Sequence, residues 1–282
     1  MNTQFAVMKR QLNSIEIIRK YVAVIRMTWI QSLEYKANIV VGTFAILSGV
    51  IIEYLLWKRI FITRGISEIG GFTFNALIIY IFYCLVVGQL KSSWVTSIEM
   101  IDGIREGELN KYLIRPISYF VYHLMLFIGH NSLYYFVYFI LITGTVIFLP
   151  EWVFPTISHG IFFVLTLFVS VYLSYTMYFL MVCFAFWFGE VRSLVIAYNL
   201  ANLVLSGQMV PMQLFPEGLR AALHFTPLPY LVDIPVSIAT GRLPAEQWVS
   251  AVGIGIFWTI LMTFAGKWLY SRGIKRYEGF GG

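Results

Sequence analysis

Ionisable side chains inside apolar stretches are the first candidates for chemistry in this sequence. Glu53 is the only carboxylate well inside a predicted membrane span, and a carboxylate in such a position can carry a proton. If the span ends near Trp57, Glu53 lies close to the outer membrane surface and can reach water or Lys58. The sequence favours this structural role, and proton coupling is the alternative.

Histidine and cysteine side chains do not form a recognisable ligand set. His123 and His130 are seven residues apart on one predicted helical face, with no nearby Cys, Asp or paired His to complete a metal site. Cys84 and Cys183 lie far apart inside apolar runs and lack CxxC spacing, which is typical of small buried hydrophobic residues. We therefore predict no metal site and no disulfide framework.

Motifs for catalysis or phosphate binding do not occur in the chain. It has no Gly-x-x-x-x-Gly-Lys-Ser/Thr loop, no His-Glu-x-x-His and no Gly-x-Ser-x-Gly. We therefore predict that the chain has no catalytic residues and no cofactor of its own. If it moves a molecule uphill, an ion gradient or a separate ATPase must supply the energy.

Composition places the chain in the membrane. Hydrophobic residues make up 59% of it and charged residues 12%, against roughly half and a quarter in soluble domains. The net charge of +6 comes from bases beside the apolar stretches, where anionic lipid and the positive-inside rule account for them, so nucleic-acid binding is excluded. The N-terminus lacks a signal-peptide pattern, and the first span must act as an uncleaved signal.

Six stretches are long enough to cross a bilayer, which requires about 20 apolar residues. The third and fourth exceed that length and must tilt, kink or project beyond the membrane. Most Lys and Arg residues fall on one side if the N-terminus is cytoplasmic, so both termini are predicted to face the cytoplasm. The predicted spans are residues 38–61, 74–95, 119–149, 157–188, 194–212 and 248–270.

An amphipathic helix is predicted before the first span. Ile15, Ile18, Val22, Ile25 and Trp29 follow the spacing of one helical face, which favours a helix lying along the membrane surface. A cytosolic helix packed on a partner is the alternative. We thus expect a cytoplasmic N-terminus at residues 1–37, a transmembrane domain at 38–270 and a cytoplasmic tail at 271–282.

A polar segment, residues 97–118, joins the second and third predicted spans. It gathers acids and bases that cannot lie in hydrocarbon, and its apolar residues recur at roughly helical spacing. Gly103 and Gly107 weaken a continuous helix, and Pro116 ends it. We predict a structured cytoplasmic hairpin with a surface that a partner contacts. The apolar residues are Ile101, Ile104, Leu109, Tyr112 and Leu113.

On the outer side, residues 206–241 form a second unusual segment. They are too apolar for an ordinary water-exposed loop, yet their prolines forbid one straight span. Two short helices that dip into the membrane and return satisfy both conditions. Since irregular backbone at membrane depth needs protein or a water-filled cavity around it, we expect this segment to line or cap a path.

A polar stripe leads into that segment. Asn199, Asn202 and Ser206 share one face of the fifth predicted span, and such a stripe can line a polar conduit or hydrogen-bond neighbouring helices. Hydrogen bonding between helices is the commoner role of Asn in membrane helices, and both interpretations remain open. Gln89, in the second span, is a weaker candidate of the same kind.

Together these features resemble the ABC-2 type permeases, the membrane subunits of type V ATP-binding-cassette exporters. The resemblance covers nearly the whole chain: an amphipathic N-terminal helix, six spans, a cytoplasmic hairpin and an external re-entrant pair. Gly107-Glu108-Leu109 followed by Leu113-Ile114-Arg115-Pro116-Ile117-Ser118 looks like the family's hairpin pattern. Gly207, Pro211, Phe215-Pro216 and Pro227-x-x-Tyr230 look like its gate segment, and residues 272–279 like its C-terminal tail.

The resemblance implies an all-α polytopic membrane protein with six transmembrane helices, an N-terminal amphipathic interfacial helix and a re-entrant helical pair between the fifth and sixth spans. It also implies a prokaryotic cytoplasmic (inner) membrane location, and a pair of cytoplasmic ATPase subunits that hold ATP and Mg. A second permease, identical or a related sister chain, would complete the path. Arg115 stands where many members carry Thr or Ser, which points to a subgroup that pairs with a sister.

Three sets of residues follow from the resemblance. The expected ATPase-coupling set is Ile101, Ile104, Arg105, Gly107, Leu109, Tyr112, Leu113, Arg115 and Pro116. The expected translocation path is Gln89, Asn199, Asn202 and Ser206, and the expected external gate is Gly207, Pro211, Phe215, Pro216, Pro227 and Tyr230.

Two other functions compete with an exporter of amphipathic drugs, peptides, lipids or lipid-linked glycans. An ion-driven secondary transporter would work through Glu53, and inverted repeats would support it, but the first and last three spans show no obvious similarity. A membrane scaffold or sensor would use the hairpin only to recruit a partner.

Overall fold

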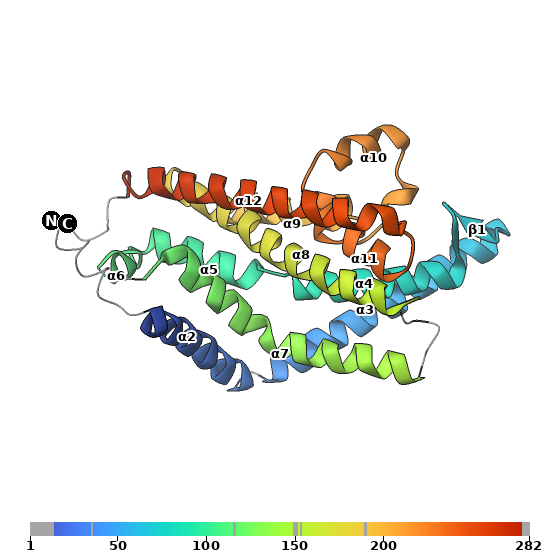
Figure 1. The fold of residues 1–282 in the computed structure, drawn as a ribbon, viewed down its shortest axis with the longest axis horizontal. Coiled ribbons are helices and arrows are strands. Elements are labelled where there is room, and N and C mark those ends of the chain that lie inside the picture. Colours follow the sequence, from blue (N-terminus) through green and yellow to red (C-terminus); the bar gives the residue numbers. More distant parts are fainter. Residues whose placement is uncertain are drawn as a thin grey trace.

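The computed structural model describes residues 14–34, 36–114, 117–148, 152, 154–188 and 191–277. These residues form an elongated helical bundle (Figure 1), which confirms the all-α prediction. The helices are α2 (Ser14–Glu34), α3 (Lys36–Arg64), α4 (Phe74–Leu90), α5 (Trp94–Arg105), α6 (Asn110–Leu113), α7 (Tyr119–Phe148), α8 (Ile157–Cys183), α9 (Arg192–Leu205), α10 (Glu217–His224), α11 (Asp233–Ala239) and α12 (Trp248–Gly273).

Five helical segments in the described part of the chain are long and apolar enough to cross a membrane. They are Val40–Arg64, Phe74–Arg105, Tyr119–Thr145, Ile157–Phe186 and Ala245–Gly273. Each contains one of the predicted spans or most of it. The second runs through both α4 and α5, so the predicted hairpin begins as a direct continuation of a span.

The fifth predicted span is shorter than expected. α9 has 14 residues, or about 21 Å at 1.5 Å per residue, against a hydrocarbon core of about 30 Å. It ends because Gly207 takes a φ of +82°, a left-handed conformation that terminates helices, and Pro211 follows. The six-span topology therefore stays a prediction.

The centre of the bundle is formed by α4, α8 and α11. The side chains of Leu77, Tyr80, Leu173 and Val236 are fully buried there in one apolar cluster. α12 runs beside α8 (Figure 1), at such short range that a Cβ on Gly266 would lie 2.9 Å from Phe179. α11 lies among these longer helices, since it contacts both α8 and α4.

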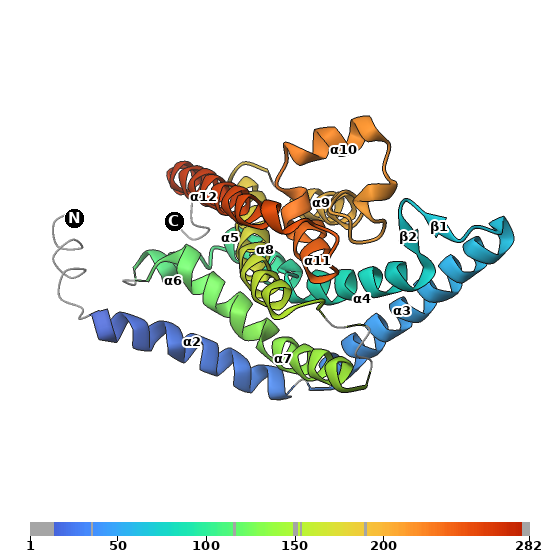
Figure 2. The same ribbon diagram turned by 45° about the vertical axis from the view of Figure 1, so that its right-hand side comes forward.

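The predicted amphipathic helix is present as α2. It lies along the first half of α7 in both ribbon views (Figures 1 and 2), where a Cβ on Gly129 would come within 2.7 Å of the Thr28 side chain. Ile18 and Val22, from the predicted apolar face, are exposed. An exposed apolar face is what a helix on the membrane surface requires, and that location stays a prediction.

The external segment contains both exposed and buried short helices. α10 projects from the bundle in both ribbon views (Figures 1 and 2), while every residue of α11 is buried. Nearby, the two-stranded hairpin β1 (Glu68–Ile69) and β2 (Phe72–Thr73) follows α3. Arg242 fixes it to the segment: its guanidinium lies 3.3 Å from the Phe72 ring centroid and donates to the Gly71 carbonyl at 3.0 Å.

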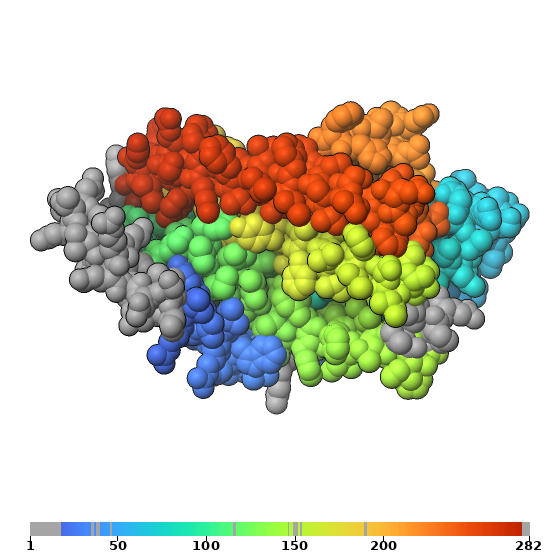
Figure 3. All heavy atoms as spheres, in the orientation of Figure 1, coloured from blue at the N-terminus to red at the C-terminus, as the bar shows by residue number. Residues whose placement is uncertain are grey.

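A broad apolar surface remains on the outside of the bundle. α12 forms a continuous exposed band along one face (Figure 3), and its exposed side chains include Ile256, Ile260 and Phe264. α3 likewise exposes Val41, Phe44 and most of its other apolar residues. Apolar surface of this extent is unusual in a soluble monomer and suits lipid or another membrane subunit.

Candidate functional site

The hairpin, residues 97–118, is built from α5, a glycine turn and α6. α5 ends at Arg105, and the Glu106 N–H donates to the Asp102 carbonyl at 2.8 Å. Gly107 has a φ of +81°, which glycine adopts without the strain that a side chain would cause. The chain reverses at this residue, and α6 follows at the end of the bundle opposite to β1 (Figure 1).

The structure divides the expected coupling set into buried and exposed residues. Ile101, Ile104 and Leu109 have exposed fractions of 0%, 5% and 0%, and they pack in one apolar cluster with α7 and α8. This corrects their placement on a contact surface: a partner cannot touch them while the hairpin is folded. Tyr112 is half-buried, with its ring centroid 5.2 Å from that of Tyr119.

The apolar part of the accessible hairpin surface is correspondingly small. Leu113 is 43% exposed, Ile114 is 68% exposed, and the Arg105 side chain is also exposed. Arg115 and Pro116 lie outside the described residues. We call Leu113 and Ile114 the hairpin tip. Two adjacent exposed aliphatic side chains with charged neighbours can form the apolar centre and polar rim of a small contact site.

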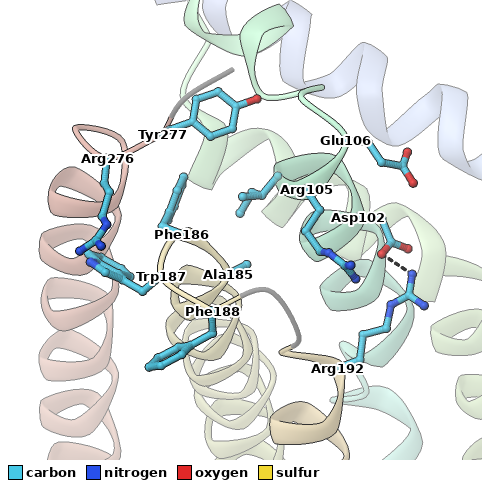
Figure 4. A pocket seen from close by; sticks show the side chains of 11 residues that line it. Asp102, Arg105, Glu106, Ala185, Phe186, Trp187, Phe188, Arg192, Arg276 and Tyr277 are labelled. Atoms are coloured by element: carbon cyan, nitrogen blue, oxygen red, sulfur yellow. Dashed lines mark hydrogen bonds and ion pairs between the residues drawn. The ribbon is translucent and has the colours of Figure 1, made fainter. Parts of the chain in front are cut away.

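A cleft of about 580 Å³ adjoins the hairpin (Figure 4). Its walls come from α5, the residues that follow α8, the start of α9 and the C-terminal tail. Across it, Arg192 at the start of α9 forms an ion pair with Asp102 of α5. The tail contributes Arg276 and Tyr277, and Trp187 lines the same cleft. The hairpin is thus joined to α9 by an ion pair, and it shares this cleft with the tail.

The expected gate residues occupy both faces of the external segment. Gly207, Pro211 and Tyr230 are buried, Phe215 and Pro227 are half-buried, and Pro216 is exposed. The Cβ of a side chain at Gly207 would lie 3.0 Å from Asp233 and 3.1 Å from Met212. The segment therefore folds back against the bundle through a turn at which only glycine fits without displacement.

The expected path residues do not form one group. Asn199 accepts a hydrogen bond from the Tyr178 hydroxyl of α8, the interhelical role that is common for membrane Asn. Asn202 and Ser206 are buried, and the Asn202 Oδ1 and Ser206 Oγ atoms have no hydrogen-bond partner among the described residues. Gln89 instead lines a separate cavity of about 550 Å³ between α2, α4, α5 and α7.

A buried contact between Tyr80 and Asp233 was not predicted from the sequence. The Tyr80 hydroxyl of α4 donates to Asp233 Oδ1 at 2.6 Å, and the two residues are 0% and 7% exposed. The Asp233 N–H in turn donates to the Ser206 carbonyl at 3.1 Å. In the sequence, Asp233 itself indicated such a contact, because a carboxylate in an apolar segment is costly to bury and usually has a function. Its partner on α4 had no sequence signal.

Asp233 should make stability depend on pH. Burial raises the pKa of its carboxyl from the ordinary value of 3.8 to about 6, despite the opposing hydrogen bond from Tyr80. The folded chain therefore binds this proton more tightly than the unfolded chain. The resulting stabilisation is complete below about pH 4 and is lost as pH rises through about 6, a change on the order of 3 kcal/mol.

The Asp233→Asn variant isolates this effect, because the amide does not titrate. We expect the Tm of the native chain in detergent, relative to that of Asp233→Asn, to fall steadily between about pH 4 and about pH 7. Thermal unfolding at a series of pH values measures both curves. Parallel curves over the whole range would show that Asp233 does not titrate there.

Two of the remaining ionisable candidates, Glu53 and His123, have local partners. Glu53 accepts a hydrogen bond from the Trp57 indole at 3.0 Å, one turn along α3. His123 is buried, with Nδ1 2.9 Å from the Tyr119 carbonyl oxygen of its own helix. Cys84 and Cys183 are free and buried. Within the described ranges there is no cluster of His, Cys, Asp or Glu that could hold a metal ion.

Comparison with known proteins agrees with this architecture. A family model described as "ABC-2 family transporter protein" matches residues 47–281, which include the hairpin, the cleft and the external segment. No curated protein matches the chain. Membership of this family implies a membrane component of an ABC transporter that works with an ATPase partner. Because the match covers most of the sequence, the chain belongs to the ABC-2 family of transporter proteins.

Proposed function

We propose that this chain is the permease subunit of an ABC exporter and forms the path for an amphipathic cargo, such as a drug, a peptide, a lipid or a lipid-linked glycan. Two cytoplasmic ATPase subunits, which bind ATP and Mg, drive it, and a second permease, identical or related, completes the path. The membrane is the prokaryotic cytoplasmic membrane, with both chain termini inside. The observation that carries the proposal is the exposed hairpin tip of Leu113 and Ile114 on a rigidly packed base.

The hairpin has the construction that a transmitting contact needs. Its tip offers apolar side chains to a partner, and its base is held by Ile101 and Leu109 in the bundle core. A force on the tip therefore moves α5 as a unit and does not merely bend a loop. The Asp102–Arg192 ion pair gives the same movement a second route, into α9.

In the proposed cycle, ATP binding closes the two ATPase subunits and pushes the hairpin tip. α5 and α4 shift together, and the packing of α4 and α9 changes. The external segment, residues 206–241, then opens for cargo. Asn199, Asn202, Ser206 and Gln89 are the proposed polar residues of the path, and no chemical step is required of this chain.

Affinity purification of the tagged full chain from native membranes tests the proposal. In mild detergent we expect an ATPase with Walker motifs to copurify, and the complex to hydrolyse ATP. Mass spectrometry also shows whether a second, non-identical permease is present. A chain that purifies alone and without ATPase activity would contradict the proposal and favour an ion-driven or scaffold role, with Glu53 as the first residue to examine.

A further inference from the structure

α4 and the hairpin form one continuous mechanical element. α4 ends at Leu90 and α5 begins at Trp94, so only three residues lie between them. Helical hydrogen bonds close both sides of this break: the Lys91 N–H donates to the Val87 carbonyl at 3.1 Å and the Ser97 N–H to the Ser93 carbonyl at 3.0 Å. Lys91 and Ser93 are 3% and 1% exposed. A short, buried, hydrogen-bonded junction transmits displacement better than a flexible linker.

α7 also holds this junction in place. The Asn131 side chain donates to the Ser92 carbonyl at 3.1 Å and to the Phe127 carbonyl of its own helix at 3.1 Å. Asn131 is itself 7% exposed. The break between α4 and α5 leaves the Ser92 carbonyl without a helical donor, and Asn131 supplies one. α4 and α5 therefore keep one fixed relative orientation.

One face of α4 packs against the external segment and makes two polar contacts with it. Tyr80 donates to Asp233 Oδ1 at 2.6 Å, and one turn later the Cys84 thiol lies 3.5 Å from the Gly207 carbonyl oxygen. Asp233 also lies beside the tight turn after α9, where a Cβ on Gly207 would come within 3.0 Å of its side chain. This face of α4 thus contacts the beginning of the external segment and its buried helix α11 together.

The Tyr80–Asp233 bond is the stronger of these two contacts. It is short, lies between two buried side chains and has an acidic acceptor, and hydrogen bonds of that kind are roughly twice as strong as those between neutral groups. A thiol is a weak donor. Burial adds to the difference, since breaking the bond would leave a polar group unsatisfied inside the bundle.

We propose that Tyr80 and Asp233 are positioning residues that connect the hairpin to the external gate, so that displacement of α5 reaches residues 206–241 through α4 and this hydrogen bond. The inference rests on the proposed function, because it assumes that the hairpin is driven from outside the chain. Tyr80 and Asp233 are the internal contact through which movement of the hairpin reaches the gate.

A matched pair of variants on α4 tests the link. Tyr80→Phe removes the hydroxyl that binds Asp233. Tyr83→Phe is the control, because Tyr83 is equally buried on the same helix and donates to the Trp152 carbonyl at 2.9 Å, outside the gate. Asp233→Asn keeps an acceptor oxygen for Tyr80 and serves as the rescuing variant, whereas Asp233→Ala does not.

Movement is read from a bimane fluorophore on a single introduced cysteine, Asn110→Cys on the hairpin or Phe225→Cys on the gate, each in the complex purified with its ATPase. Both positions are exposed, and native Cys84 and Cys183 are buried. Fluorescence is compared before and after trapping with ATP and vanadate. The Tm of each variant is measured to confirm that it is folded.

In the native chain, Tyr83→Phe and Asp233→Asn, we expect trapping to change both signals. In Tyr80→Phe and Asp233→Ala, the hairpin signal should change as before and the gate signal should be lost or reduced several-fold. A full gate signal in Tyr80→Phe would overturn the link while leaving the proposed function intact. A hairpin signal that does not change in the native chain would contradict the proposed function itself, and the link with it.

Discussion

Leu113→Asp is expected to remove the ATPase from the purified complex, whereas Leu219→Asp is expected to leave it bound. The two leucines are a matched pair, since they are 43% and 41% exposed. Leu113 lies at the hairpin tip, while Leu219 lies on α10 toward the other end of the bundle (Figure 1). A carboxylate at the centre of an apolar contact cannot make the apolar interactions of leucine, and it must also lose its hydration when the partner binds. A loss of about 2 kcal/mol or more, or over tenfold in affinity, is usual for a central contact residue.

The measurement is the ratio of ATPase to permease after affinity purification, together with the ATP hydrolysis rate of the eluted complex. Because Leu113 is a surface residue, the Tm of the free permease should change little in either variant. That result separates lost docking from misfolding. Equal ATPase ratios in the two variants would show that the hairpin tip is not the docking site.

Leu109→Ala, unlike Leu113→Asp, should cause a large loss of folding stability. Leu109 is 0% exposed and packs with Met100, Ile101 and Tyr119. Truncating a buried leucine removes its apolar contacts and leaves a cavity, at a cost of about 2–5 kcal/mol. Leu113→Ala, four residues further on, should cost no more than about 0.5 kcal/mol, as is typical of exposed positions.

Thermal unfolding in one detergent measures both variants, with the native chain as reference. We expect the Tm to fall by several degrees in Leu109→Ala and to stay near the native value in Leu113→Ala. A similar decrease in both would mean that the tip is packed against the rest of the chain and that α6 is not available to a partner.

The two leucines also show how far the sequence can predict the hairpin. Charge clustering indicated the segment, because charged residues are costly to place in hydrocarbon. Apolar spacing could not say which residues face inward. The turn at Gly107, with its φ of +81°, resets the helical phase between α5 and α6, so a single periodicity carried through from Ile101 to Leu113 assigns faces wrongly.

The external segment was also predictable in part. Its prolines indicated interrupted short helices, and α10 and α11 are such helices. The partner of Asp233 could not be predicted, since Tyr80 is 153 residues away and a tyrosine in an apolar helix has no distinguishing pattern. The length of α9 was overestimated because the apolar composition continues beyond the turn that ends the helix.

The distance along the chain between Tyr80 and Asp233 has a consequence for biosynthesis. Ribosomes add about 5–20 residues per second, so Asp233 follows Tyr80 by roughly 8–30 s. When α4 first enters the membrane, α11 has not yet been synthesised and the cluster that encloses it is incomplete. The Tyr80 hydroxyl must use water or a temporary partner until then, because an unsatisfied hydroxyl in hydrocarbon is costly. A nascent chain released before residue 233 would keep this face of α4 without its partner.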